Sequence, residues 1–245
     1  MERKNAITVK NLYIRYRGLK KTSIRASWTR IFKKKINVFE AVKNVSFEVP
    51  EGKIFGIIGK NGSGKSTLLK AIAGIFSPDE GSIDLHGKTV SLLSIGVGFN
   101  RKLSGLENIY LSGLLLGFSE KEIDAKKKEI IEFADIGDFI HKPVKTYSSG
   151  MYSKLAFAIT AVMETDIILI DEVLSVGDAA FKRKSYNKMK ELISDETRTV
   201  IIVSHSIPVL RELCDEVLWM HDGEIKEQGD TNEVLDKYEA FMDKK

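Results

Sequence analysis

A glycine-rich loop between an apolar run and a helical pattern constrains this chain more than any other feature. Residues 59–66 read Gly-Lys-Asn-Gly-Ser-Gly-Lys-Ser; the apolar run 54–58 precedes them and the helical pattern 67–73 follows. Glycines allow backbone N–H groups to turn inward around an anion, and the next helix adds the positive end of its dipole. A strand, a glycine-rich loop and a helix in this order predict a phosphate-binding P-loop, a name kept below for residues 59–66.

Two side chains at the end of the P-loop carry specific predictions. Lys65 is expected to reach the β- and γ-phosphates of a nucleotide, and the hydroxyl of Ser66 is expected to bind Mg²⁺. A chance glycine-rich turn is the alternative. All fixed positions of the motif are present between a strand and a helix, which favours the functional interpretation.

Composition places the chain among folded, intracellular proteins. Its 245 residues suit one domain, 1–245, and 43% hydrophobic with 29% charged residues is typical of a globular chain. No apolar stretch approaches the roughly 20 residues of a membrane span, and the N-terminus lacks the apolar segment of a secretory signal. The single cysteine, Cys214, excludes an internal disulfide or a cysteine-rich zinc site and is expected to be a buried core residue.

Positive charge is concentrated near the N-terminus. From Arg15 to Lys35 there are nine basic residues and no acidic one, and subtracting these nine from the net charge of +4 leaves −5 for the rest. The apolar residues in this stretch fall at i, i+4, i+7 and i+8, which predicts a basic amphipathic helix over 19–36 at a membrane surface. A solvated helix packed on its own domain is the alternative. The apolar residues concerned are Ile24, Trp28, Ile31 and Phe32.

Apolar runs alternate with helical patterns along most of the chain. This alternation predicts an α/β fold: a P-loop NTPase sheet flanked by helices, with an inserted helical lobe at about 100–160. Residues 221–223, His-Asp-Gly, predict a hairpin turn. The expected strands are 6–10, 45–49, 54–58, 82–85, 166–171, 199–204 and 216–220, and the expected helices are 105–117, 119–134, 135–141, 149–163, 207–214 and 231–245.

Two carboxylates end the apolar run 166–171. An acid at the carboxyl end of a central strand faces the crevice where α/β sheets bind ligands. Asp171 is therefore expected in the Mg²⁺ shell, and Glu172 is expected to polarise an attacking water. A plain strand-to-loop boundary is the alternative, and the P-loop upstream argues against it.

A short segment of small residues opens the helix 149–163. It reads Tyr-Ser-Ser-Gly-Met over residues 147–151, which fits either an anion site at a helix N-terminus or a helix cap made by Ser148 or Ser149. Here the chain resembles the nucleotide-binding subunit of an ABC transporter, whose Leu-Ser-Gly-Gly-Gln signature occupies this place. Ser148 and Gly150 match the positions that contact the γ-phosphate bound on a partner subunit, whereas Tyr147, Ser149 and Met151 depart from the pattern.

The resemblance implies further site residues. Residues 175–178, Ser-Val-Gly-Asp, resemble the D-loop, which lies across the dimer seam, and His205 resembles the histidine that touches the γ-phosphate. Tyr16 resembles the adenine-stacking aromatic, with Phe39 as a rival and core packing as the alternative for Tyr16. The family usually has a glutamine between the P-loop and the helical lobe. The only glutamine of this chain, Gln228, lies far beyond that stretch, and Ser94 is expected to take the place of the missing residue.

The motifs and the resemblance together give the predicted site. For ATP binding it comprises Tyr16, Gly59, Asn61, Gly62, Ser63, Gly64, Lys65, Ser66 and Thr67; for catalysis Lys65, Glu172 and His205; for Mg²⁺ Ser66 and Asp171; for contact with the partner's ATP Ser148, Ser149 and Gly150; and for the D-loop Ser175 and Asp178.

The positions at which this chain departs from the usual family motifs indicate which subfamily it resembles. The segments 93–99, 147–151 and 171–178 together resemble ATPases that export lipid-linked polysaccharides such as wall teichoic acids, O-antigens and galactans. Because the chain stops at Lys245, it resembles the short form without a carbohydrate-binding domain.

The resemblance also implies partners. It predicts a head-to-tail pair of subunits enclosing two ATP molecules with Mg²⁺, docked to a polytopic membrane subunit at the cytoplasmic face of the cell membrane. The transported molecule would be a lipid-linked glycan, and no nucleic acid is expected. Two alternatives remain open: a soluble ABC ATPase acting on nucleic acid or ribosomes, and the ATPase of an importer.

Overall fold

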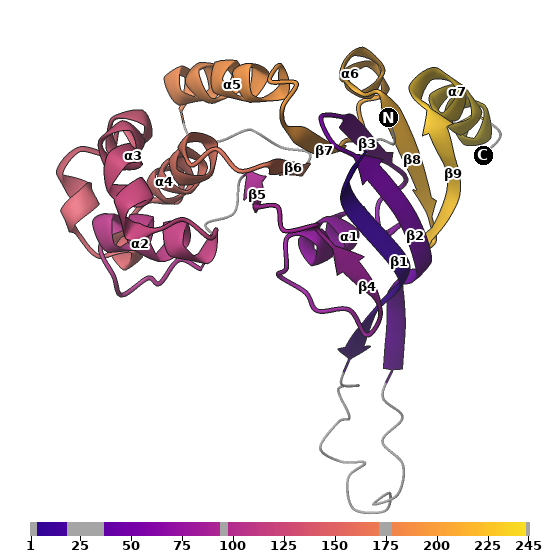
Figure 1. Cartoon of the computed structure of the whole chain (residues 1–245), viewed down its shortest axis with the longest axis horizontal. Coiled ribbons are helices and arrows are strands. Elements are labelled where there is room, and N and C mark those ends of the chain that lie inside the picture. Colours follow the sequence, from indigo (N-terminus) through magenta and orange to yellow (C-terminus); the bar gives the residue numbers. More distant parts are fainter. Residues whose placement is uncertain (1–3, 19–36, 94–97, 172–177, 244–245) are drawn as a thin grey trace, which may run out of the picture.

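A six-stranded sheet forms the centre of the protein (Figure 1). The computed structural model describes residues 4–18, 37–93, 98–171 and 178–243. The strand order is β5-β6-β7-β3-β8-β9, and all neighbouring pairs are parallel except β8 with β9, which are joined as a hairpin by the expected turn at 221–223. The strands are β3 (Ile54–Ile58), β5 (Val90–Leu93), β6 (Ile167–Asp171), β7 (Thr199–Val203), β8 (Glu216–His221) and β9 (Glu224–Asp230).

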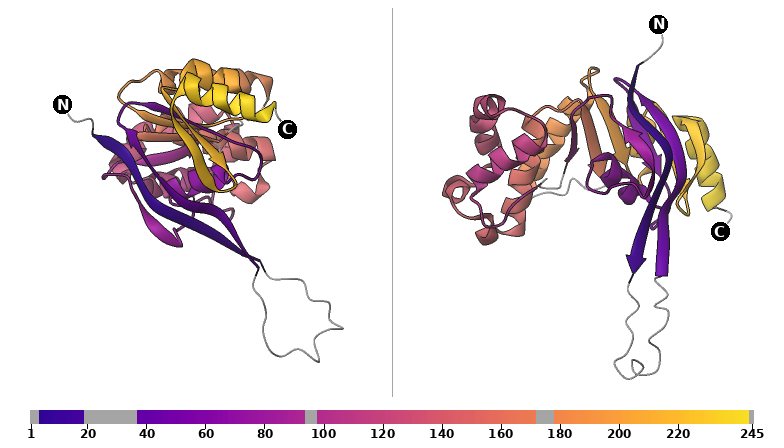
Figure 2. Two further views of the ribbon diagram at one scale, coloured as in Figure 1. Left: turned by 90° about the vertical axis from the view of Figure 1, so that its right-hand side faces the viewer. Right: turned by 60° about the horizontal axis from the view of Figure 1, so that its bottom comes forward.

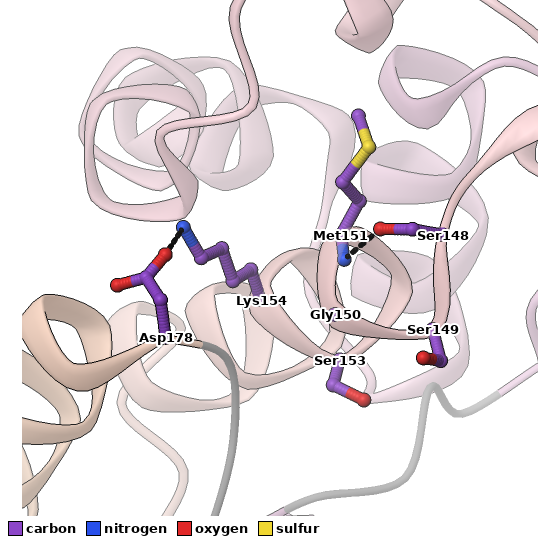
Figure 3. Close-up of a pocket in the computed structure, with 7 residues that line it drawn as sticks. All are labelled: Ser148, Ser149, Gly150, Met151, Ser153, Lys154 and Asp178. Atoms are coloured by element: carbon purple, nitrogen blue, oxygen red, sulfur yellow. Dashed lines mark hydrogen bonds and ion pairs between the residues drawn. The ribbon is translucent and has the colours of Figure 1, made fainter.

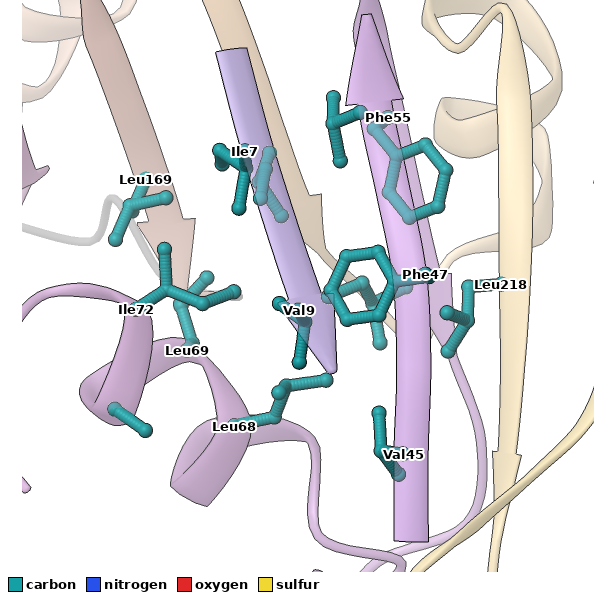
Figure 4. Packing of buried hydrophobic residues seen from close by; sticks show 14 of the residues in the cluster. Ile7, Val9, Val45, Phe47, Phe55, Leu68, Leu69, Ile72, Leu169 and Leu218 are labelled. Carbon is teal, nitrogen blue, oxygen red and sulfur yellow. The ribbon is translucent and has the colours of Figure 1, made fainter. Parts of the chain in front are cut away.

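Alternate residues of the central strands enter two different cores. On β6, Ile167 and Leu169 pack on one face of the sheet, while Ile168 and Ile170 pack on the other. A strand buried on both faces has no polar side, and this explains the continuous apolar runs in the sequence. Figure 4 shows the first core, in which Leu68 and Leu69 of α1 (Lys65–Ile72) meet strands of both sheets.

A second, antiparallel sheet covers the face that carries α1. Its order is β2-β1-β4, and β1 and β2 pair along their length, with Tyr16 opposite Phe39. These strands are longer than the expected 6–10 and 45–49, and Arg15 of the basic run lies in β1, where its guanidinium pairs with Glu40 and Glu80. The predicted amphipathic helix 19–36 lies outside the described residues. The strands are β1 (Asn5–Gly18), β2 (Asn37–Pro50) and β4 (Glu80–Asp84).

A group of helices lies at one end of the sheet, to the left in Figure 1. Ser104 caps the helix that begins at Gly105, and Ser119 caps the helix that begins at Glu120. Each serine forms a reciprocal capping box with the glutamate three residues later. These helices share an apolar core of their own, to which α4 contributes Leu155, Ala158, Ile159 and Val162, while Phe157 and Ala161 of the same helix pack in the second core of the central sheet. The elements are α2 (Gly105–Leu115), α3 (Glu120–Ala134), the short 3₁₀ turns η2 (Gly137–His141) and η3 (Val144–Thr146), and α4 (Ser149–Val162).

Three more helices cover the other face of the central sheet (Figure 2). They are α5 (Ala179–Ile193), α6 (Ile207–Leu213) and α7 (Thr231–Met242), and α5 was not expected from the sequence. Cys214, at the end of α6, is half-buried, and burial raises the pKa of its thiol to about 12. Among the described residues, the helices are too short or too polar to cross a bilayer.

Candidate functional site

The P-loop follows β3 and is packed against the backbone of distant strands. A Cβ at Gly59 would collide with the carbonyl oxygen of Met220, and one at Gly64 would collide with that of Ala41. Gly64 also has φ +101°, in the left-handed region that favours glycine. Both glycines are therefore required by the close approach of the loop to β8 and β2.

Lys65 is turned into the P-loop. Its side chain is buried, and its Nζ donates hydrogen bonds to the carbonyl oxygens of Gly59 at 2.7 Å and Lys60 at 2.9 Å. The hydroxyl of Ser63 is also buried and has no hydrogen-bond partner among the described residues. A buried ammonium and an unpaired donor within one glycine-rich turn fit a phosphate group, which is rich in acceptor oxygens.

Ser66 and Asp171 come together from two elements. The Ser66 hydroxyl, in the first turn of α1, donates to Asp171 Oδ1 at the end of β6 at 3.2 Å. A hydroxyl and a carboxylate are the hard oxygen ligands that Mg²⁺ prefers, so this pair fits the metal that nucleotide chemistry requires. Asp171 is the last described residue of β6, and Glu172 lies outside the described residues.

Two aromatic side chains stand beside the P-loop. Tyr16 and Phe39 are cross-strand neighbours with exposed fractions of 42% and 60%, and the Tyr16 hydroxyl is hydrogen-bonded to the Thr67 hydroxyl at 3.1 Å. The Tyr16 ring also meets Phe76 edge to face, 5.9 Å between centroids. Both aromatics line one pocket of about 220 Å³, the P-loop pocket, and His205 after β7 lines it too. Its full lining is Tyr16, Phe39, Ala41, Asn61, Gly62, Gly64, Lys65, Ser66, Thr67 and His205.

The residues of the signature segment, 147–151, lie elsewhere. Ser148, Ser149 and Gly150 line a separate hollow of about 470 Å³, the signature hollow, shown in Figure 3. Ser148 caps α4, since its Oγ accepts a hydrogen bond from the Met151 N–H at 3.2 Å. A single copy therefore does not bring these residues into the P-loop pocket. The hollow is also lined by Met151, Ser153, Lys154 and Asp178.

An ion pair closes one side of the signature hollow. Lys154 Nζ lies 2.7 Å from Asp178 Oδ2, and Figure 3 shows the two side chains reaching toward each other from α4 and the start of α5. Asp178 also accepts a hydrogen bond from the Phe181 N–H and so caps α5. The hydrogen bond from Lys154, followed by that from Phe181, lowers the pKa of Asp178 to about 2.

Two contributions to the site could not be expected from the sequence. Lys154 carries no motif signal that relates it to Asp178. The turn at Gly223 was predicted as a turn only, yet its N–H donates to the carbonyl of Ser63 at 3.1 Å and its carbonyl accepts from the Lys43 N–H at 2.8 Å. Ser94 and Ser175 lie outside the described residues.

The family described as ABC transporter matches residues 42–175, more than half of the 245 residues. The chain belongs to the ABC transporter family. The resemblance drawn from the P-loop and signature segments is thereby confirmed. Solved structures agree in fold: an ATP-binding subunit of an ABC transporter superposes with a TM-score of 0.69 over 95% of this chain and 93% of its own at 19% identity. A dimeric post-hydrolysis cassette bound to ADP and phosphate superposes with a TM-score of 0.67 over 92% of this chain and 98% of its own, at 22% identity.

Curated relatives within the ABC transporter family share a narrower name. A teichoic acids export ATP-binding protein, TagH, of Staphylococcus haemolyticus is 43% identical over 237 residues, which are 97% of this chain and 89% of the relative. The protein of the same name from Bacillus anthracis is 48% identical over 204 residues, or 83% of this chain and 37% of the relative. The chain thus spans little more than a third of the length of that Bacillus relative.

Proposed function

We propose that this chain is the ATP-hydrolysing subunit of an exporter that moves a lipid-linked polysaccharide, of the teichoic acid type, across the cytoplasmic membrane. The observation that carries the hydrolytic part is the hydrogen bond between Ser66 and Asp171 beside the buried Lys65. The substrate class is supported by relatives at 43–48% identity that are named as teichoic acid export proteins. The subunit would act from the cytoplasmic face, against a polytopic membrane partner.

The P-loop pocket is proposed to hold ATP. Backbone N–H groups of the glycine-rich turn and the Lys65 ammonium would bind the phosphate oxygens, and Ser66 with Asp171 would hold Mg²⁺. When bound, Mg²⁺ neutralises charge on the phosphate oxygens. His205 lines the same pocket and is proposed to hydrogen-bond the terminal phosphate, while Glu172 is proposed to orient the attacking water.

Two copies are proposed to complete each site. Because the P-loop pocket and the signature hollow are separate within one chain, Ser148 and Gly150 of one copy would face the P-loop of the other in a head-to-tail pair. Small residues at the start of α4 present backbone N–H groups and the Ser148 hydroxyl, which suit the terminal phosphate. The D-loop, with Asp178 at its end, would lie at the seam of this pair.

The experiment that tests this function is the Glu172→Gln substitution. It removes the proposed base and keeps the shape, so the purified variant is expected to form a stable ATP-loaded dimer with little turnover. Light scattering coupled to size-exclusion chromatography, with and without Mg-ATP, measures the dimer, and phosphate release measures turnover. Near-normal hydrolysis, or a variant that stays monomeric with ATP, would contradict the proposal.

Contact with the membrane is proposed for the segment 19–36. Replacing its arginines and lysines by glutamine should reduce export in reconstituted vesicles and leave ATP hydrolysis in detergent unchanged. Unchanged export would remove this segment from the proposal. The same basic run could instead contact the phosphates of RNA in a soluble ABC ATPase. Salt-sensitive binding to RNA, without a co-purifying membrane subunit, would favour that alternative.

A further inference from the structure

The hydroxyl of Tyr147 joins two parts of the helical lobe immediately before the signature serine. Its Oη donates a hydrogen bond to the carbonyl of Phe139, in η2, at 2.7 Å. The same oxygen interacts with the backbone of Gly105, the first residue of α2. The ring meets that of Phe139 at 6.2 Å, nearly perpendicular to it. Tyr147 is thus held by its ring, by the hydrogen bond that its hydroxyl donates to Phe139, and by the close fit of that hydroxyl against Gly105.

Gly105 provides the room for this hydroxyl. A Cβ at Gly105 would collide with Tyr147 Oη and approach Ile140 Cδ1 to 3.0 Å. The φ of Gly105 is not in the left-handed region, so its backbone does not itself require glycine. The glycine at the start of α2 and the tyrosine before α4 therefore fit each other.

The chain leading to the signature segment is bonded to the chain leading to α2. Val144 N–H donates to the Leu103 carbonyl at 2.9 Å, and Lys145 N–H donates to the Arg101 carbonyl at 2.8 Å. Tyr147 is the last anchor of this series before Ser148, whose side chain is exposed in the signature hollow. Burial raises the pKa of Tyr147, so its hydroxyl remains a protonated donor at neutral pH.

We infer that Tyr147 is a positioning residue whose hydroxyl, seated over Gly105, holds Ser148 in place toward the nucleotide bound by a partner copy. This inference rests on the proposed function, because Ser148 has no phosphate to meet within its own chain. A leucine, the residue that the family signature has here, provides no donor for the Phe139 carbonyl. The position of the signature serine is thus set in this chain by a polar anchor.

A complementation experiment tests whether Tyr147 acts across the pair. Tyr147→Phe removes only the hydroxyl, and loss of one partly buried hydrogen bond predicts a roughly fivefold fall in the first-turnover rate of ATP hydrolysis. In a mixture with excess Glu172→Gln protein, the Tyr147→Phe copy keeps its own P-loop and glutamate and receives an intact signature from its partner. Its first turnover should return to the wild-type rate. The double variant Glu172→Gln/Tyr147→Phe, used as the partner instead, should give no recovery.

A matched variant separates positioning from simple loss of stability. The Tyr110 hydroxyl is also hydrogen-bonded within the helical lobe, to Asp124 and Lys127, on the side formed by α2 and α3. Tyr110→Phe should lower the melting temperature while hydrolysis stays within about twofold of wild type. Gly105→Ala should impair hydrolysis as Tyr147→Phe does, and the two substitutions together should be less than additive because removing the hydroxyl relieves the collision.

The outcomes are distinguishable. If Glu172→Gln forms no ATP-dependent dimer, the proposed function fails and this inference fails with it. If that dimer forms, a wild-type rate for Tyr147→Phe alone, or equal rates with the two partners, overturns the inference and leaves the proposed function standing.

Discussion

Ser66 and Asp171 lie within hydrogen-bond distance although one begins α1 and the other ends β6. In the central sheet, β7 stands between β6 and β3, the strand that leads into the P-loop. The hydroxyl therefore reaches the carboxylate across the top of an intervening strand, at the carboxyl ends of the parallel strands, where α/β sheets bind ligands.

Removing either member of this pair should weaken the use of Mg²⁺. Ser66→Ala and Asp171→Asn each remove one oxygen from the proposed metal site, so we expect the Mg²⁺ concentration for half-maximal hydrolysis to rise at least about tenfold. Titration of hydrolysis with Mg²⁺ measures this. Ser91→Ala is the control, since it removes a buried hydrogen bond between β5 of the same sheet and Thr165, which precedes β6, and it does not touch the site. Unchanged Mg²⁺ dependence in both site variants would contradict the assignment.

Lys65→Met should weaken the binding of ATP. The substitution keeps the length of a buried side chain but removes the ammonium and leaves the carbonyls of Gly59 and Lys60 without their donor. We expect the Kd for Mg-ATP to rise by about tenfold or more, measured by calorimetry. An unchanged Kd with a folded protein would show that the ammonium does not reach the phosphates.

Substitutions of Tyr16 and Phe39 can show which of the two rings stacks on adenine. If Tyr16 stacks on adenine, Tyr16→Ala should weaken ATP binding by roughly tenfold, whereas Phe39→Ala should have a smaller effect. Inorganic triphosphate, which has no base, should bind both variants as it binds wild type. The opposite order of effects would assign the stacking role to Phe39.

Asp178 gives the protein a defined acid sensitivity. Its pKa is about 2 against an ordinary value of 3.8, so the folded state favours the carboxylate. The resulting stabilisation is present above about pH 4 and is lost as the pH falls from 4 toward 2. Asp178→Asn keeps a good capping residue and removes the charge, so its urea midpoint should lie below that of wild type at pH 7, and the gap should narrow below pH 4.

Asp195 serves as the matched control for Asp178. Hydrogen bonds from Thr197 and Arg198 lower its pKa to about 2 as well, so Asp195→Asn should show the same pH window of destabilisation. Only Asp178→Asn should also slow ATP hydrolysis, because Lys154 and Asp178 join the signature helix to the end of the D-loop. Equal rates of hydrolysis by the two variants would show that the ion pair between Lys154 and Asp178 has only a structural role.

The buried strands and the P-loop could be predicted from the sequence because a single physical requirement determines the residues of each of these short segments. The runs ending at Asp171 and Ser204 indicated buried strands because both of their faces are apolar, and the P-loop was identified by its fixed positions. The lengths of β1 and β2 were missed because irregularities in their pairing between Val9 and Arg15 interrupt the period-two pattern of side chains along β1.

Relationships between distant segments were not accessible from the sequence. Helix α5 has few apolar residues, and its buried side chains, Phe181 among them, are widely spaced between lysines. The fit of Tyr147 over Gly105 depends on the fold of the lobe, and neither residue type alone predicts it. The support that Gly223 gives to Ser63 likewise exists only once the β8–β9 hairpin is in place.

That last contact has a consequence for the order of events during synthesis. Residues 59–66 leave the ribosome long before residues 220–223, which hold them in shape. We therefore expect nascent chains to lack this support for the glycine turn during most of translation. We expect the nucleotide site to take its final shape only when the β8–β9 hairpin docks against it.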